Sequence, residues 1–297
     1  MSTTVSDTPR PSASLILVNE HNEVLLVQRN TQARSFAGTH VFPGGNFDAD
    51  QDTSLAMTAI RETFEETGLL VASPVSLHPL NKSTLEQARH AIYERNLDFR
   101  TFLRCHGCET DLTSLYPFTT WVTPLIIPRR FRTQFYITFL RESLNTLPCE
   151  QRIDTVPTPD GGQEVISTCF VRPSLAIAEF RKGNINLPPP QYYLLDTLCQ
   201  LLTGNINTRD QRDKVLLLSQ GPFGRLVIQP KLHRDPESKE EMFLYEGDEL
   251  RGGPPGRHHR AMVKRKGTVF SKIDLRRNFD IFKDDLSEVF DITTAKL

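Results

Sequence analysis

The sequence predicts an α/β protein in which strand and helix signals follow one another along the chain. Two apolar runs that flank a polar loop at Asn19–Glu23 form a β-hairpin pattern within Ala13–Arg29. A segment with helical spacing follows and stops at Gly68, where a left-handed residue would close a helix. Further on, Phe131–Leu140 alternates between apolar and polar residues as a strand does. These three signals indicate a sheet with helices packed on it.

The composition sets the class of protein. The chain has 297 residues, of which 38% are hydrophobic and 24% charged, which is typical of a soluble globular protein with a core of its own. The net charge of −1 predicts neither a nucleic-acid partner nor an anionic membrane. Apolar runs such as Leu15–Val18 are far too short to span a membrane. The first residues, 1–12, lack the apolar core of a signal peptide, and we interpret them as a disordered lead-in.

The five cysteines favour a reducing compartment over a disulfide scaffold, because they are odd in number and widely spread. Cys105 and Cys108 form a CxxC pair, but no second close pair completes a zinc site. A helix that ends at Gly107 is the favoured interpretation of this stretch.

The remaining elements are predicted in chain order. A short strand is expected at His40–Pro43, a helix from Thr53 or Ser54 to Thr67, and a strand or loop at Val71–Leu77. Helical spacing over Thr84–His106 predicts one or two helices inserted at about 78–118. Such an insertion either forms a lid or specificity wall beside a site or only adds packing, and the sequence leaves both open.

The second half continues with shorter elements. After a strand that restarts near Trp121–Pro124, the pattern predicts a turn at Pro157–Gly162, a strand at Glu164–Phe170, a helix at Pro173–Lys182, an extended segment at Leu187–Tyr193 and a helix at Leu194–Leu202. Beyond Gly204 we expect a β-rich extension with strands at Lys214–Leu218, Arg225–Pro230, Met242–Tyr245 and Ala261–Lys266. Its stretch Arg251–Lys266 holds six Lys or Arg and two His, either an anion patch or, more simply, a solvated loop and strand.

Three glutamates share one face of the helix that ends before Gly68. Glu62, Glu65 and Glu66 are related by i, i+3 and i+4 spacing, and their repulsion costs roughly 0.2–0.5 kcal/mol per pair on an isolated helix. They form either a solvated face or a cation site. Oxygen-only ligation with room for substrate phosphates suits Mg²⁺ or Mn²⁺. Arg61, four residues before Glu65, can brace the cluster.

The stretch Val41–Leu70 resembles the Nudix box, GGx…RExxEExGL, of the Nudix hydrolase family. The loop between Gly45 and Arg61 is two residues longer than in the common form, and its usual Glu has no clear counterpart. The acidic or amide residues that could replace that Glu are Asp48, Asp50, Gln51 and Asp52. The resemblance implies an α/β/α sandwich with a mixed sheet.

The segment before this box carries a second resemblance. The run LLVQRNTQARSFAGTHVFPGG, from Leu25 to Gly45, is similar to the coenzyme A (CoA) recognition signature of Nudix CoA diphosphatases, LLTxR(S/A)x₃Rx₃Gx₃FPGG. The matching substrate-binding positions are Arg29, Arg34, Gly38, Phe42 and Gly44. The two arginines offer guanidinium groups for phosphates. The stretches WVTP…RRFRTQFY and PPPQYYLL also resemble the peroxisomal branch of the family.

Together these resemblances imply hydrolysis of the diphosphate bond of CoA or acyl-CoA to 3′,5′-ADP and (acyl) 4′-phosphopantetheine. Glu62, Glu65, Glu66 and a backbone group of Gly45 would bind the metal, and Arg61 would orient the cluster. The general base stays open between a helix glutamate and Glu164, which follows a turn and could approach the site. The rivals are another nucleoside diphosphate derivative (ADP-ribose, a dinucleotide or an RNA cap) and a non-catalytic binding module of the same fold.

The last three residues, Ala295-Lys296-Leu297, are a conservative variant of the Ser-Lys-Leu peroxisomal address. They predict a peroxisomal import receptor as a partner and a peroxisomal location, with the cytoplasm as the alternative. The expected domain organisation is a lead-in at 1–12, a Nudix domain at 13–203 and a C-terminal extension at 204–297.

Overall fold

The structure is a computed structural model that describes residues 8–33, 37–74, 80–140, 157–162, 164–236, 239–267 and 269–283. Its strands are β1 (Arg10–Val18), β2 (Val24–Arg29), β3 (His40–Val41), β4 (Gly44–Asn46), β5 (Ala72–Pro74), β6 (Cys108–Thr110), β7 (Tyr116–Val122), β8 (Phe131–Phe139), β9 (Val165–Val171), β10 (Val227–Ile228), β11 (Lys231–Arg234), β12 (Glu241–Leu244), β13 (His259–Lys266) and β14 (Val269–Arg277). Its α-helices are α1 (Leu55–Thr67), α2 (Lys82–Tyr93), α3 (Phe99–Cys105), α4 (Pro173–Lys182), α5 (Pro189–Cys199), α6 (Arg209–Gln220) and α7 (Pro222–Arg225).

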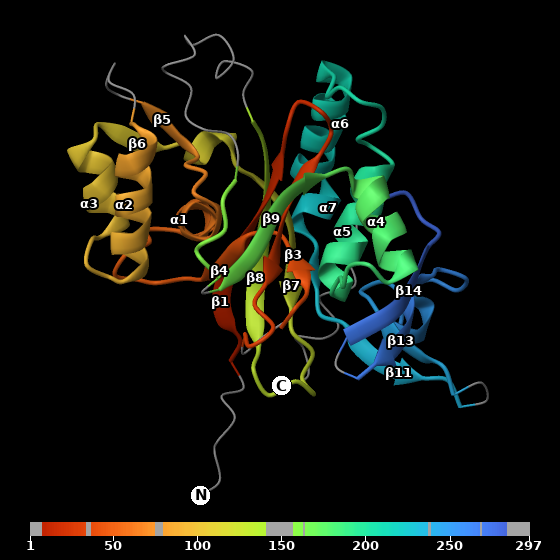
Figure 1. The fold of residues 1–297 in the computed structure, drawn as a ribbon. Helices are drawn as coiled ribbons and strands as arrows, with labels where there is room; N and C mark the ends of the chain where they lie inside the picture. The colour runs from red at the N-terminus through yellow and green to blue at the C-terminus, as the bar shows by residue number, and fades with distance from the viewer. Residues whose placement is uncertain are drawn as a thin grey trace, which may run out of the picture.

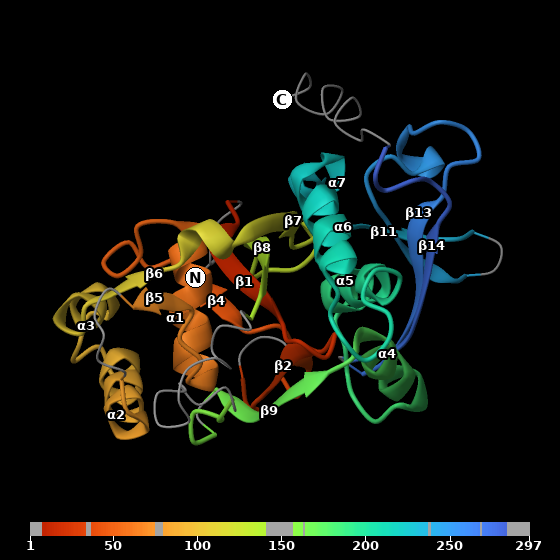
Figure 2. The ribbon, with the colours of Figure 1, turned by 90° about the horizontal axis from the view of Figure 1, so that it is seen from above.

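A mixed sheet forms the middle layer of the molecule. Its main path runs β10-β7-β8-β1-β2-β3, with β4 paired to β1 and β9 paired to β2. The pair β1–β8 is parallel, whereas β7–β8 and β1–β2 are antiparallel. Helix α1, with α2 and α3 outside it, lies on one side of the sheet, and α4 to α7 lie on the other (Figure 1). The view from above shows the same three layers, which confirms the predicted α/β/α sandwich with a mixed sheet (Figure 2).

Strand β1 connects the two hydrophobic layers because its side chains alternate between the two faces. Leu15 packs with α1 and the inserted helices, whereas Ile16 packs with the helices of the opposite layer. Both side chains are fully buried. The predicted hairpin is confirmed, with Asn19–Glu23 as the connection between β1 and β2. The strand begins earlier than expected, since Arg10, Pro11 and Ser12 pair with β8 instead of belonging to a lead-in.

The inserted segment folds as two helices, as its spacing predicts. Asn81 and Asp98 cap α2 and α3 by accepting hydrogen bonds from the backbone N–H groups of Thr84 and Thr101. Gly107 follows the end of α3 with a φ of 59°, in the left-handed region. In the described part of the chain no cluster of three His, Cys, Asp or Glu side chains is arranged as a metal site, so the CxxC pair has no additional ligands there.

Two predicted elements are wrong. The segment Leu187–Tyr193 is not extended throughout, because α5 begins at Pro189, where a proline without an N–H group fits the first helical turn. The strand expected at Lys214–Leu218 is the middle of α6. Thr208 and Gln211 form a capping box at the start of α6, a signal that the strand interpretation overlooked.

The C-terminal residues form an antiparallel sheet of their own. Strands β11, β12, β13 and β14 pair in this order. The strands expected at Met242–Tyr245 and Ala261–Lys266 are confirmed within a residue or two as β12 and β13. Of Arg225–Pro230, only β10 is a strand, and it extends the central sheet by pairing with β7 in parallel. This second sheet lies beside α4 and α5 at the outer edge of the molecule (Figure 2).

Helix lengths also bear on membrane insertion. Among the helices of the described ranges, none combines the length and the apolar character that crossing a bilayer requires.

Candidate active site

Helix α1 carries the acidic side chains, and both its ends are fixed by local contacts. The Ser54 side chain accepts a hydrogen bond from the Met57 N–H at the first turn, a cap typically worth about 1 kcal/mol. Gly68 ends the helix with a φ of 74° and donates its N–H to the Phe64 carbonyl. The predicted helix is confirmed, so Glu62, Glu65 and Glu66 lie within about 1.1 turns of one another.

Arg61 is the buried centre of the cluster. Its Nε and Nη2 donate to the two carboxylate oxygens of Asp52 at 2.8 and 2.9 Å. Its Nη1 donates to Glu65 Oε1 at 2.8 Å, and Nη2 also donates to Glu62 Oε1 at 3.0 Å. Burial alone would lower the pKa of Arg61, but the Asp52 hydrogen bonds and the surrounding carboxylates raise it above its ordinary value. Arg61 is therefore permanently charged and orients the acidic residues.

Of the four loop residues that the sequence left open, Asp52 is the one whose carboxylate contacts Arg61. The residue is 3% exposed, and besides the hydrogen bonds from Arg61 its carboxylate accepts hydrogen bonds from Thr58 Oγ1 and from the Asp48 N–H. Asp48 instead pairs with Arg95 of the insertion, and Asp50 is exposed. The longer loop thus places a carboxylate against the helix arginine, nine residues before it in the chain.

Glu62 lies against the backbone of Gly45. A Cβ atom at Gly45 would approach the carboxyl carbon of Glu62 to 2.3 Å, so only glycine leaves room for this carboxylate. Burial, together with the charges of Glu65 and Glu164, outweighs the lowering effect of Arg61 and raises the pKa of Glu62 to about 7. The residue lines the main cavity described below.

Glu66 is the most enclosed of the three glutamates, at 4% exposure. Its Oε2 accepts the Gly44 N–H at 3.0 Å, and its Oε1 has no hydrogen-bond partner. Burial and the nearby Glu62 raise the pKa of Glu66 well above its usual range. A buried carboxylate oxygen without a donor is costly unless a cation approaches it.

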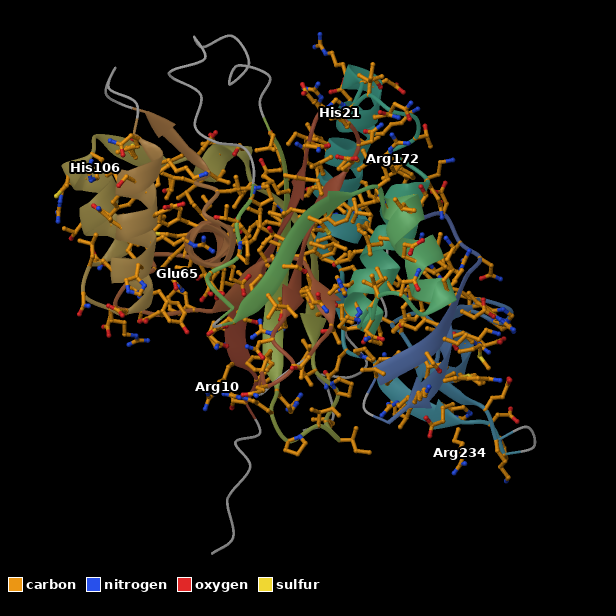
Figure 3. The ribbon with its side chains drawn as sticks, viewed as in Figure 1. Arg10, His21, Glu65, His106, Arg172 and Arg234 are labelled. Carbon is orange, nitrogen blue, oxygen red and sulfur yellow. The ribbon has the colours of Figure 1, made fainter. Side chains whose placement is uncertain are left out.

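The backbone of Glu65 contacts the inserted helix α2. Figure 3 shows Glu65 at α1, between α2 and the central sheet. Its backbone carbonyl accepts a hydrogen bond from Arg89 Nε of α2 at 2.7 Å. Arg89 Nη1 also donates to Thr158 Oγ1 and to the Pro159 carbonyl, at 3.1 and 3.3 Å. The insertion therefore joins the end of α1 to the segment that precedes Glu164.

Glu164 and Arg29 meet at the other side of the cluster. Arg29 Nη2 lies 3.3 Å from Glu164 Oε2, and Arg29 Nη1 lies 3.6 Å from Glu66 Oε1. Pairing of β2 with β9 produces this proximity, and the Asn30 N–H donates to the Glu164 carbonyl. The structure therefore brings together Arg29, Arg61, Glu62, Glu66 and Glu164. Arg34, the second arginine of the predicted signature, lies outside the described residues.

The other predicted substrate-binding positions, Gly38, Gly44 and Phe42, set the path of the backbone or line the cavity. Gly38 has a φ of 67°, which favours glycine. A Cβ atom at Gly44 would lie 2.3 Å from the Ala13 carbonyl oxygen, so this glycine allows β4 to approach β1. Phe42 is 2% exposed and contributes its ring edge to both the core and the cavity wall.

A cavity of about 760 Å³ opens beside Glu62. One part is bounded by Arg29, Gln32, Ala33, Tyr93 and Glu164, the other by the β7–β8 loop, the start of α5 and the C-terminal sheet. Sequence reasoning missed the contributions of Tyr93 and the C-terminal sheet to this cavity, because these residues reach it only through tertiary packing.

The donor set fits a divalent cation in its chemistry. Glu62 and Glu66 present carboxylates whose pKa values are raised by burial, and Glu66 Oε1 accepts no hydrogen bond and has only the 3.6 Å ion pair with Arg29. Arg61 donates hydrogen bonds to both Glu62 and Glu65, and among the described residues no three acidic side chains already converge on one point. Glu62, Glu65, Glu66 and the backbone at Gly45 are the groups that offer oxygen ligands for a Mg²⁺ or Mn²⁺ ion.

Comparison with known proteins identifies the family to which this chain belongs. Residues 50–198, half of the chain, match the family model described as the NUDT19 Nudix domain. The chain belongs to the Nudix family. The crystal structure of a Nudix hydrolase from Alicyclobacillus acidocaldarius is 22% identical and superposes with a TM-score of 0.53 over 68% of this chain and 99% of that one. This likeness confirms the Nudix fold.

Three curated relatives are similar in sequence. A Caenorhabditis elegans protein named nudix hydrolase 7 is 30% identical over 66% of this chain and 63% of its own length. Proteins named acyl-coenzyme A diphosphatase NUDT19 are 25% identical in Xenopus laevis, over 60% of each chain, and 32% identical in Homo sapiens, over 48% of this chain and 38% of that one. The Nudix chain described here therefore spans less than two thirds of each of these relatives.

Proposed function

We propose that the protein hydrolyses the diphosphate bond of CoA or acyl-CoA, with a divalent cation, to 3′,5′-ADP and (acyl) 4′-phosphopantetheine. The observation that carries this proposal is the buried Glu66 carboxylate, whose Oε1 has no hydrogen-bond donor and lies 3.6 Å from Nη1 of Arg29 of the CoA-type signature. The relatives named acyl-coenzyme A diphosphatase support the same substrate class.

The chemistry follows from the groups present. Water adds to one phosphorus of the diphosphate, the bridging P–O bond breaks, and the proton of the water is taken up by a base. The three glutamates of α1, with the backbone at Gly45, would hold Mg²⁺ or Mn²⁺. When bound, the cation supplies charge neutralisation at the phosphate oxygens and polarises the attacking water. Arg61 holds Glu62 in position, and Arg29 lies where it can exchange a carboxylate contact for a phosphate oxygen.

Two groups can serve as the base. Glu164 keeps 47% of its side chain exposed beside Arg29, and a helix glutamate not engaged by the cation is the other. A Glu164→Gln variant separates them. If Glu164 is the base, kcat falls while the affinity for Mn²⁺ stays unchanged; if kcat is also unchanged, a helix glutamate removes the proton.

The direct test is incubation of the folded protein with CoA and either Mg²⁺ or Mn²⁺, followed by mass analysis of the products. We expect 3′,5′-ADP and 4′-phosphopantetheine, and activity at least about tenfold lower in Glu66→Gln. Glu109→Gln, an exposed glutamate on β6, is the matched control and should retain activity. Absence of 3′,5′-ADP with both metals contradicts the proposal, and turnover of ADP-ribose, a dinucleotide or capped RNA in its place would identify a rival substrate. Cation binding without any turnover would favour a binding module.

The location follows a separate line of reasoning. The tripeptide Ala295-Lys296-Leu297 lies outside the described residues, and its role as a peroxisomal address rests on the sequence. Deletion of Leu297 from a protein tagged at its N-terminus should change a punctate distribution to a cytosolic one. An unchanged distribution would reject import through this tripeptide.

A further inference from the structure

One part of the cavity lining is rich in apolar side chains, unlike the lining around the carboxylates. Phe243 and Phe270 of the C-terminal sheet contribute to it, together with Pro189 at the start of α5. Ile126 and Ile127 of the β7–β8 loop line the same cavity and are 70% and 40% exposed. Large aliphatic side chains exposed together at the mouth of a cavity indicate an apolar ligand.

Two arginines border this apolar region without acidic partners. Arg265 lies over the rings of Phe270 and Phe243, at 5.0 and 5.8 Å from their centroids, and Arg129 lies 5.9 Å from the centroid of Phe131. Within the described ranges, no carboxylate forms an ion pair with either guanidinium. In the same basic stretch as Arg265, by contrast, Arg251 pairs with Glu246 and Arg260 with Asp248. Arg129 and Arg265 therefore have N–H groups available to a ligand.

The wall of this apolar region also contains a buried hydrogen-bond acceptor. Gln191, in the first turn of α5, lines the cavity at 8% exposure, and its Oε1 has no hydrogen-bond partner. The helix start is a poor phosphate site, because Pro189 and Pro190 have no N–H groups to offer an anion. An unsatisfied carboxamide oxygen calls for an N–H or O–H donor, which an ionised phosphate does not have.

We propose that this apolar region, formed by the β7–β8 loop, the start of α5 and the C-terminal sheet, binds the pantetheine arm of the substrate and the acyl chain attached to it. The proposal rests on the proposed function and extends it. A pantetheine arm carries two secondary amides, whose N–H groups match Gln191 Oε1 and whose carbonyls match the free guanidinium donors. An acyl chain beyond the arm would cover Ile126 and Phe270. Arg29, which lines the same cavity beside Glu164, remains for the adenosine phosphates, so that Glu62 would lie between the two halves of the substrate.

The test uses binding without turnover. Trp121 is the only tryptophan of the chain and lines the cavity, so its fluorescence reports occupancy. Titrations in EDTA measure the Kd of three ligands. Dodecanoyl-CoA, kept below its micelle concentration, carries the pantetheine arm and an acyl chain; CoA carries the arm alone; 3′,5′-ADP carries neither. The variant Ile126→Ser removes an exposed apolar contact, and Ile206→Ser, 69% exposed and away from the cavity, is the matched control.

We expect Ile126→Ser to raise the Kd of dodecanoyl-CoA roughly three- to tenfold, with CoA and 3′,5′-ADP almost unchanged. Gln191→Met, of similar volume, should raise the Kd of CoA and dodecanoyl-CoA by the same factor and leave that of 3′,5′-ADP unchanged. Unchanged Kd values for all ligands in both variants overturn the proposal. A raised Kd of 3′,5′-ADP also overturns it, because it would assign the region to the adenosine half. Failure to hydrolyse CoA while these affinities shift as expected contradicts the proposed function alone.

Discussion

Asp52 and Arg61 form a buried, bidentate ion pair at the base of the glutamate cluster. Both residues are 3% exposed, and their two hydrogen bonds are 2.8 and 2.9 Å long. Removal of one partner of such a pair lowers the stability by much more than the pair contributes in net terms, because the other charge stays buried without compensation.

Replacement of Asp52 by Ala should therefore lower the free energy of unfolding by about 3 kcal/mol, because Arg61 loses its bidentate acceptor. Activity should fall as well, since Arg61 then draws Glu62 and Glu65 out of position. Chemical denaturation measures the first effect and CoA turnover the second. Asp50→Ala, in the same loop but exposed, is the control and should change stability by less than about 0.5 kcal/mol. Equal effects of the two substitutions would show that Asp52 does not support the helix arginine.

The raised pKa of Glu62 predicts how stability without metal depends on pH. Because the pKa is about 7 in the folded protein and 4.5 ordinarily, the folded state holds the proton more tightly. Its contribution is complete below pH 4.5 and is lost as the pH rises through about 7. In EDTA, the melting temperature should rise as the pH falls from 8 to 6, and Glu62→Gln should weaken this dependence. Mg²⁺ should raise the melting temperature at pH 8, where the carboxylates are charged. A wild-type protein and a Glu62→Gln variant with identical pH profiles would contradict the assignment.

Helices α2 and α3 act on the site as an attached unit. Phe64 of α1 stacks on Phe102 of α3, with ring centroids 5.6 Å apart, and Arg89 binds both the Glu65 carbonyl and the segment at Thr158. The sequence left two roles open for the insertion, packing or a wall beside the site. The insertion does both: it packs on Phe64 of α1 through Phe102, and its Tyr93 lines the cavity.

An Arg89→Met variant should release the segment that leads to Glu164. The loss of three hydrogen bonds from a buried guanidinium should lower stability by roughly 1–3 kcal/mol, and amide hydrogens of residues 157–165 should exchange faster. We also expect kcat to decrease more than KM increases. Arg104→Met, on the exposed side of α3, is the control for loss of an arginine from the insertion. Unaltered exchange at 157–165 would show that Arg89 serves only the packing of α2.

Across the whole molecule, the C-terminal sheet is joined to the Nudix core by a buried histidine. His259 of β13 donates its Nδ1–H to the Glu246 carbonyl at 2.6 Å, and its Nε2 accepts the Tyr193 hydroxyl of α5 at 2.8 Å. Only the Nε2 contact requires the neutral ring, because a protonated ring can still donate its Nδ1–H. Burial lowers the pKa of His259 to about 3, although the Glu246 hydrogen bond opposes this change.

This lowered pKa predicts acid sensitivity of the joined sheets. The unfolded chain binds a proton near pH 6.5, whereas the folded protein resists it down to about 3, so the contribution of His259 is complete above pH 6.5 and is lost as the pH falls toward 3. Between pH 6.5 and 4.5, the wild type should lose stability, by up to a few kcal/mol, relative to a His259→Gln variant that does not titrate. Denaturation midpoints of both proteins over this range measure the difference. A constant difference between them would show that protonation of His259 does not couple to folding.

Local patterns in the sequence determined most elements and the acidic face. Alternation identified β1, β2 and β8, helical spacing identified α1 and the insertion, and the spacing of Glu62, Glu65 and Glu66 identified one face of α1. These features depend on residues close together in the chain. The misassigned α5 and α6 are the exceptions, where apolar runs outweighed the Pro189 and Thr208 start signals.

Contacts between distant residues were decided by the tertiary structure. The choice of Asp52 among four loop residues, the pairing of Arg29 with Glu164 across 135 positions and the Arg89 bridge all depend on how the layers pack. The sequence indicated a metal-binding helix and a CoA-type loop before it. Only the packing of the C-terminal sheet against α5 and the β7–β8 loop revealed that the cavity continues into an apolar region, because no periodicity records which surfaces meet.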